Sequence, residues 1–126
     1  MSVSVLIIDD NPINLKLAAQ VLASEGFSVE RAQDAEQAQL ILERTLPDLI
    51  LMDIAMPGMD GLTLARQLKV DARFRHIPVV ALTASAMKGD DRKALAAGCA
   101  GYVTKPIDTR EFARQVRAFL QSDSRR

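Results

Sequence analysis

The sequence is almost without cysteine, since Cys99 is the single one among 126 residues. One cysteine cannot form an internal disulfide, so nothing in the chain indicates an oxidising compartment. None of its near neighbours carries a charge that would activate a thiolate. We therefore expect Cys99 to be a small buried residue rather than a reactive one.

The chain also has no excess charge, because 16 basic residues balance 16 acidic ones. Proteins that bind nucleic acid or anionic membranes usually carry a basic excess, so we expect neither as a direct partner. No apolar run approaches the roughly 18 residues of a membrane span. The run Val3–Ile8 is too short for a signal peptide, and two aspartates follow it. We expect a cytoplasmic location.

The length fits one ordinary domain, and 48% hydrophobic residues are enough for a real core. We expect the domain to span residues 1–121, followed by a polar tail over 122–126. Strand and helix patterns alternate five times within it. Strands are expected at Val3–Ile8, Phe27–Arg31, Leu49–Met52, Val79–Leu82 and Tyr102–Val103.

Each strand is followed by a helix pattern. In the first, apolar residues lie on one face (Leu15, Ala18, Ala19 and Leu22). Asn11 is a plausible cap for that helix, Pro12 suits its first turn, and Gly26 ends it. Capping boxes are expected in the pairs Asp34–Gln37 and Asp108–Glu111.

Such alternation, with strands that are apolar throughout, predicts a parallel sheet covered by helices on both faces. Five units are too few for a closed eight-stranded barrel, so we expect an open, doubly wound α/β sheet. In such sheets ligands bind beyond the carboxyl ends of the strands.

Polar side chains gather at that predicted edge. They are Asp9 and Asp10 after the first strand, Asp53 after the third, Thr83 after the fourth and Lys105 after the fifth. Three crowded carboxylates would repel one another, and a hard cation such as Mg²⁺ would relieve the repulsion. Lys105 adds a point-like positive charge, and Thr83 can donate a hydrogen bond. Together they predict a socket for a phosphoryl group carried by one carboxylate.

The chain resembles the receiver domains of bacterial two-component response regulators over essentially its whole length. The matching motifs are Asp9-Asp10, the segment Asp53-Ile54-Ala55-Met56-Pro57-Gly58-Met59-Asp60-Gly61, Thr83-Ala84 and Lys105-Pro106. Residues 76–107 also resemble stand-alone cell-cycle regulators and the receivers of hybrid kinases. The resemblance implies a flavodoxin-like fold with five helices and strand order 2-1-3-4-5.

The resemblance further implies that Asp53 accepts a phosphoryl group from a sensor histidine kinase or a histidine phosphotransfer protein. It implies Mg²⁺ as the cofactor, bound by Asp10, Asp53 and the backbone carbonyl of Ala55, with Asp9 acting through water. Thr83 and Lys105 would contact the phosphoryl oxygens. Tyr102 matches the family's switch aromatic.

Downstream partners are expected on a face made by the helix over residues 89–97, the fifth strand and the last helix. The helix carries few large apolar side chains, so its displacement should cost little. Arginines at 110, 114 and 117 form a solvated stripe or a docking face. Ile13 with Pro106 and Ile107 forms an exposed patch for a kinase or phosphotransfer helix, or else Ile13 is part of the core.

Two other functions fit the sequence less well. One is a phosphohydrolase with an aspartyl-phosphate intermediate. Phosphatases of the haloacid dehalogenase class use an acidic residue two positions after the nucleophilic aspartate as general acid or base, and here Ala55, at that position, cannot move a proton. A phosphate-independent binding module would have a damaged pocket, whereas this one is complete. A stand-alone protein and a segment of a longer one both agree with the sequence.

Overall fold

The computed structural model describes residues 3–54, 61–83 and 89–124. Five parallel strands form one sheet in the expected order β2-β1-β3-β4-β5. The strands are β1 (Ser4–Ile8), β2 (Ser28–Ala32), β3 (Leu49–Asp53), β4 (Val79–Thr83) and β5 (Gly101–Thr104). The helices are α1 (Pro12–Ser24), α2 (Ala35–Arg44), α3 (Gly61–Val70), α4 (Asp90–Ala96) and α5 (Phe112–Ser124).

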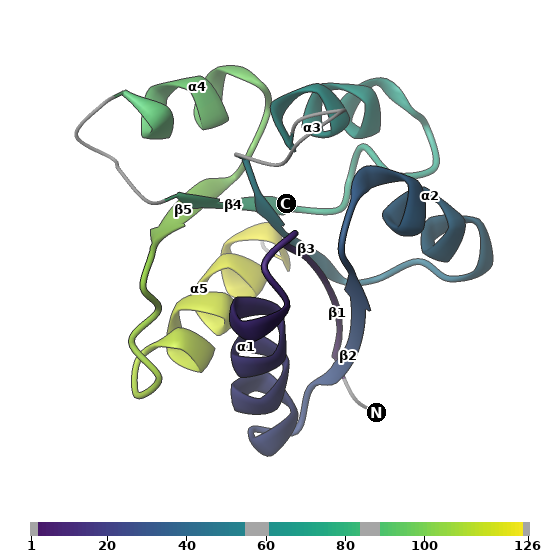
Figure 1. The fold of residues 1–126 in the computed structure, drawn as a ribbon. Coiled ribbons are helices and arrows are strands. Elements are labelled where there is room, and N and C mark those ends of the chain that lie inside the picture. Colours follow the sequence, from purple (N-terminus) through teal and green to yellow (C-terminus); the bar gives the residue numbers. More distant parts are fainter. Residues whose placement is uncertain (1–2, 55–60, 84–88, 125–126) are drawn as a thin grey trace.

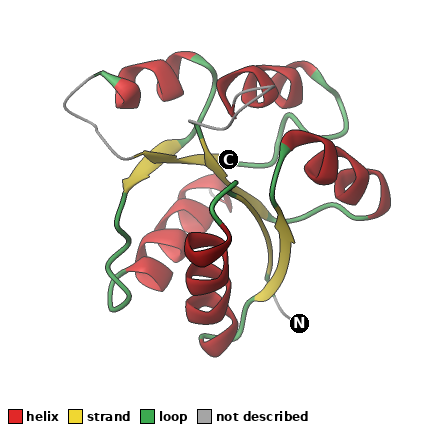
Figure 2. Ribbon diagram, viewed as in Figure 1, coloured by secondary structure: helices red, strands yellow, loops and turns green. Residues whose placement is uncertain are grey.

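The sheet lies between two helical layers (Figure 1). Helices α1 and α5 cover one face, and α2, α3 and α4 cover the other. Each face has its own buried cluster of apolar side chains, and the two clusters share no residue. Figure 2 shows the strands as one curved layer in the middle of the molecule. Strands β3 and β4 are buried along their whole length, as strands covered on both faces should be.

Local signals at α1 are confirmed. The Asn11 side chain accepts hydrogen bonds from the N–H groups of Ile13 and Asn14 at 2.9 and 3.2 Å, and Pro12 occupies the first helical position. Gly26 has a left-handed φ of 93°, which favours glycine after a helix. The chain therefore leaves β1 and enters α1 at a fixed angle beside the predicted site.

Two of the other helix signals need correction. Asp34 caps α2 through the Gln37 N–H at 2.8 Å, but the Gln37 side chain accepts from the N–H of Gln33, one residue before the cap. The Asp108–Glu111 capping box was wrong, because the Asp108 carboxylate accepts the N–H of Arg110 instead. A short-range bond of this kind competes with helical capping.

The end of the chain also differs from expectation. Helix α5 continues to Ser124, so three residues expected in a polar tail are helical. Arg110, predicted to lie on the last helix with Arg114 and Arg117, lies before α5 instead. Arg110 and Arg114 pair locally with Asp108 and Glu111, and Arg117 pairs with the distant Glu25 at 3.3 Å. Exposed pairs of this kind contribute little stability.

Cys99 is buried, and burial raises the pKa of its thiol to about 11, so it is an inert packing residue at neutral pH. Among the helices in the described part of the chain, none is long and apolar enough to cross a membrane.

Candidate functional site

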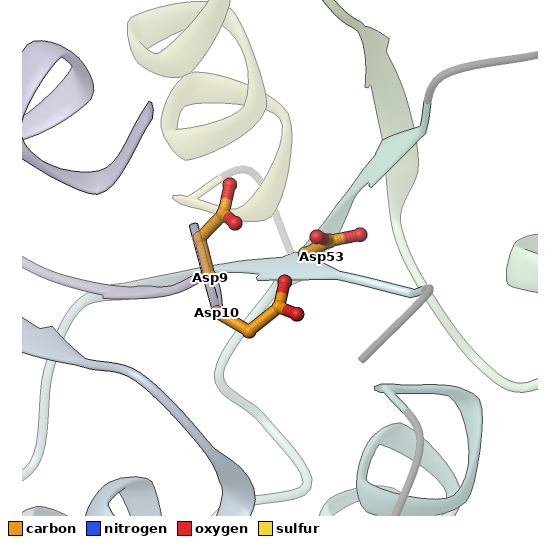
Figure 3. A group of neighbouring side chains, drawn as sticks. All are labelled: Asp9, Asp10 and Asp53. Atoms are coloured by element: carbon orange, nitrogen blue, oxygen red, sulfur yellow. The ribbon is translucent and has the colours of Figure 1, made fainter. Parts of the chain in front are cut away.

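The acidic residues predicted to form a site do meet at the carboxyl edge of the sheet. Figure 3 shows Asp9 and Asp10 on the chain leaving β1, beside Asp53 at the end of β3. One carboxylate oxygen from each lies within 4.8 Å of the others. Asp9 and Asp53 are buried, with 1% and 6% of their surface exposed, whereas Asp10 is exposed.

Lys105 joins the two buried carboxylates. Its Nζ lies 3.0 Å from Oδ2 of Asp9 and 3.0 Å from Oδ2 of Asp53. Burial acts to lower the pKa of Lys105, but the hydrogen bonds and charges of Asp53 and Asp9 outweigh it and raise that pKa. Lys105 therefore stays positively charged and partly neutralises the cluster.

Asp9 has a perturbed carboxyl group. Burial raises the pKa of Asp9, and the Asn11 N–H together with Lys105 opposes that rise without cancelling it. The Asn11 N–H donates to Oδ1 of Asp9 at 2.9 Å, so Asp9 is held at both oxygens. Sequence reasoning identified Asn11 as a helix cap but missed this second role, although its position two residues after Asp9 allows the bond.

Strand alternation explains which predicted residues converge. Successive residues of a strand point to opposite faces of the sheet. The cluster beneath α1 and α5 contains an apolar residue from each of three strands: Ile7, Leu51 and Val103. The polar residue two positions after each of these continues the alternation and points to the same face. These polar residues are Asp9, Asp53 and Lys105. Thr83 follows Val79 and Ala81, whose side chains lie in the other cluster. The lysine therefore meets the carboxylates from the same side, and Thr83 approaches the edge from the opposite face.

Tyr102 shares the face of Thr83. Its register partner on β4 is Ala81, so the ring lies on the side of the sheet covered by α4. Tyr102 is 38% exposed and is therefore not a core residue in this state. Among the side chains that the structure describes in α4, Ala94 alone is buried, and Leu95 is half exposed.

The donor set suits a hard divalent cation. Carboxylate oxygens are the ligands that Mg²⁺ prefers, and Mg²⁺ usually keeps several waters as further ligands. Asp9, Asp10 and Asp53 bring three such oxygens together at an open edge. The predicted fourth ligand, the carbonyl of Ala55, lies outside the described residues.

A groove opens beside the cluster, between α1 and the segment after β5. It has a volume of about 250 Å³, and its lining includes Leu17, Ala18, Leu82, Pro106 and Ile107. Ile13 on α1 is 77% exposed, so it is a surface residue and not part of the core.

Comparison with known proteins agrees with this geometry. Residues 5–117 match the response regulator receiver domain family. The chain is 39% identical over 120 residues to the polar-differentiation response regulator DivK of Brucella ovis, covering 95% of this chain and 98% of DivK.

Two solved structures share the whole fold. A putative response regulator from Chloroflexus aurantiacus superposes with a TM-score of 0.91 at 28% identity, covering 96% of this chain and 99% of its own. The receiver domain of a sensor histidine kinase from Pseudomonas aeruginosa superposes with a TM-score of 0.87 at 33% identity, covering 96% of this chain and 99% of that domain. That crystal structure has a magnesium ion coordinated in its active-site cleft.

Proposed function

The chain belongs to the family of response regulator receiver domains, and from this we propose that it is a signalling switch whose phosphoryl acceptor is Asp53. The observation that carries the proposal is the bond between Lys105 Nζ and Asp53 Oδ2 at 3.0 Å, on a carboxylate that is only 6% exposed. Asp9 and Asp10 stand beside it as supporting carboxylates. A carboxylate so placed can act as a nucleophile toward phosphorus.

The transfer would be a displacement at phosphorus. An Asp53 oxygen attacks the phosphorus of a phosphohistidine, a new O–P bond forms, and the P–N bond breaks with its electron pair returning to the imidazole. Lys105 already touches Asp53, so its ammonium group is placed to hold an oxygen of the arriving phosphoryl group. Thr83 would donate to another of these oxygens from the opposite face of the sheet.

Asp9, Asp10 and Asp53 would hold Mg²⁺. When bound, Mg²⁺ supplies positive charge that neutralises the charge on the transferred phosphoryl group. The exposed position of Asp10 suits a direct ligand that is free to adjust. Asp9, fixed by Asn11 and Lys105, suits a role through an intervening water.

The test of this function is phosphorylation without a partner protein. Incubation with Mg²⁺ and phosphoramidate, whose P–N bond resembles that of phosphohistidine, should add one phosphoryl group to each chain. Excess chelator should prevent the addition. A protein that stays unmodified, while a related receiver is labelled under the same conditions, would contradict the proposal.

The phosphoryl donor in the cell would be a histidine kinase or a phosphotransfer protein. The groove between α1 and the segment after β5 opens beside Asp9 and Lys105, and its lining is mainly apolar. Ile13 adds an exposed apolar side chain on α1. We propose that an apolar helix of the donor docks there and presents its phosphohistidine to Asp53.

Replacement of Asp10 by alanine should lower the affinity for Mg²⁺ at least tenfold, because it removes a direct ligand. In chelator the midpoint of thermal unfolding should stay the same or rise, because Asp10 is exposed and its removal relieves carboxylate repulsion. The dependence of the melting temperature on Mg²⁺ concentration measures both quantities. Glu30→Ala, which removes an exposed carboxylate from β2, is the control. Unchanged Mg²⁺ dependence in Asp10→Ala would rule out Asp10 as a ligand.

Thr83 and Tyr102 would carry the signal outward. Movement of the buried Thr83 toward a phosphoryl group would leave space beside β5, into which the exposed Tyr102 ring could turn. Helix α4 is held by few large side chains, so this face can have two arrangements of similar free energy. Downstream partners would bind the face formed by α4, β5 and α5 and distinguish its two arrangements.

Thr83→Ala should therefore still bind the phosphoryl analogue beryllofluoride but transmit less of the change. Amide chemical-shift changes in α4 and at Tyr102 should fall by about half or more on loss of one charge-assisted hydrogen bond. Thr104→Ala, which truncates the exposed register partner of Thr83, is the matched control. Equal shift changes in wild type and Thr83→Ala would refute the coupling.

A further inference from the structure

A glycine packs directly against the backbone of the acceptor residue. Gly61 is the first residue of α3 and is buried. A Cβ atom built on it would lie 2.4 Å from the carbonyl oxygen of Asp53 and 2.8 Å from Cα of Ile54. Ordinary contacts between carbon and a carbonyl oxygen are about 3.3 to 3.6 Å, so any side chain at position 61 would overlap this backbone by about 1 Å.

Backbone conformation does not explain this glycine. The glycines with positive φ in the described residues are Gly26, Gly89 and Gly98. Gly61 is therefore in a conformation that every residue can adopt, and alanine would be the better helix former there. What requires glycine is the close approach of α3 to the end of β3.

Neither side of the contact can move easily. The end of β3 is fixed by its neighbour, because Asp53 pairs with Leu82 and the Ile54 N–H donates to the Leu82 carbonyl at 3.3 Å. Helix α3 is fixed by Leu64, Ala65 and Leu68, which are buried in the core. An added methyl group must shift the acceptor's backbone, the helix, or both.

We infer that Gly61 is a positioning residue for phosphoryl acceptance. Because Gly61 has no side chain, the first turn of α3 can pack directly against the Asp53 backbone. This contact fixes the position of the Asp53 carboxylate relative to Asp9, Asp10 and Lys105. This inference rests on the proposed function, and misplacement of a reacting group by about 1 Å costs on the order of 100-fold in rate.

The chain offers a matched control. A Cβ atom on Gly101, in β5, would lie 2.3 Å from Cε1 of the Phe119 ring. The distance is as short as at Gly61, but the overlap falls on the end of a side chain of α5, which can turn aside, and not on the acceptor's backbone. Gly101→Ala therefore reports the effect of an added methyl group that a side chain, and not the acceptor's backbone, must accommodate.

The experiment compares Gly61→Ala and Gly101→Ala with wild type. Gly61→Ala should slow phosphorylation by phosphoramidate on the order of 100-fold at saturating Mg²⁺, whereas Gly101→Ala should change the rate less than about threefold. In chelator, the amide chemical shifts of Asp53 and Ile54 should change in Gly61→Ala and stay near wild type in Gly101→Ala. Melting temperatures show how much each variant is destabilised.

Wild-type rates in a folded Gly61→Ala, or equal slowing in the two variants, would overturn the inference while leaving the acceptor assignment intact. Failure of wild type to be phosphorylated would instead contradict the proposed function. If Gly61→Ala is largely unfolded in buffer, the same rates are measured in trimethylamine N-oxide, which favours compact states. A near-normal rate for the refolded variant would count against the positioning role.

Discussion

Replacement of Asp53 by asparagine should abolish phosphorylation, with at least a 100-fold loss of labelling by phosphoramidate, and leave the fold intact. An amide has nearly the shape of a carboxylate but lacks the anionic oxygen that attacks phosphorus. Asp53 is buried at the end of β3, and its side chain contacts Lys105 at 3.0 Å. An amide oxygen can still accept a hydrogen bond from that ammonium group, so the local packing is preserved.

The control for this variant is Asp10→Asn, which removes a carboxylate from the same cluster without removing the proposed nucleophile. It should slow labelling through weaker Mg²⁺ binding, and high Mg²⁺ should restore much of the rate. Full labelling of Asp53→Asn, with a circular dichroism spectrum like that of wild type, would show that another residue accepts the phosphoryl group.

Replacement of Lys105 by methionine should destabilise the metal-free protein by about 2 to 4 kcal/mol at pH 7, because it leaves two buried carboxylates without their cation. The side chain of Lys105 is 18% exposed and that of Asp9 is 2% exposed, so solvent screens this pair far less than a surface pair. Methionine keeps most of the lysine's apolar stem and therefore isolates the loss of charge.

The loss should shrink as the pH falls. Burial already raises the pKa of Asp9, and removal of Lys105 takes away an attraction that opposes the rise. A carboxyl group whose pKa is higher in the folded state opposes folding above that folded pKa, and this cost vanishes below the unfolded value of about 3.9. The free energies of unfolding of Lys105→Met and wild type should therefore converge between pH 7 and pH 4.

Urea unfolding in chelator at several pH values measures this convergence. Mg²⁺ should also recover part of the lost stability, since it supplies positive charge to the same carboxylates. Arg73→Met is the control, because it breaks a 2.9 Å ion pair with Asp71 at the surface. It should show little change at any pH. A stability loss in Lys105→Met that is independent of pH would contradict the picture of a lysine that neutralises buried carboxylates.

Much of the fold follows from local patterns. The apolar runs that became β3 and β4 are continuous because helices cover both of their faces, and the caps at Asn11 and Gly26 follow from bonds within a few residues. The wrong prediction at Asp108 also concerns bonds within a few residues. The Glu111 N–H donates to the backbone carbonyl of Asp108 at 3.0 Å, and the Asp108 carboxylate accepts the Arg110 N–H instead.

The site was predictable as a set of residues but not as a geometry. Strand ends predicted that Asp9, Asp53 and Lys105 would meet, and they do. The sequence does not show that one lysine binds both carboxylates, because this depends on how β1, β3, β4 and β5 are aligned with one another. The contact of Gly61 with Asp53 was missed for a similar reason, since a close approach between α3 and β3 leaves no periodic pattern.

The most direct test of the central claim is to locate the phosphoryl group in the wild-type protein. After phosphorylation with phosphoramidate and Mg²⁺, borohydride reduces an aspartyl phosphate to an alcohol, and peptide mass spectrometry identifies the altered residue. We predict modification at Asp53 and no other position. Modification at Asp9, Asp10 or a hydroxyl side chain, with Asp53 unchanged, would contradict the account.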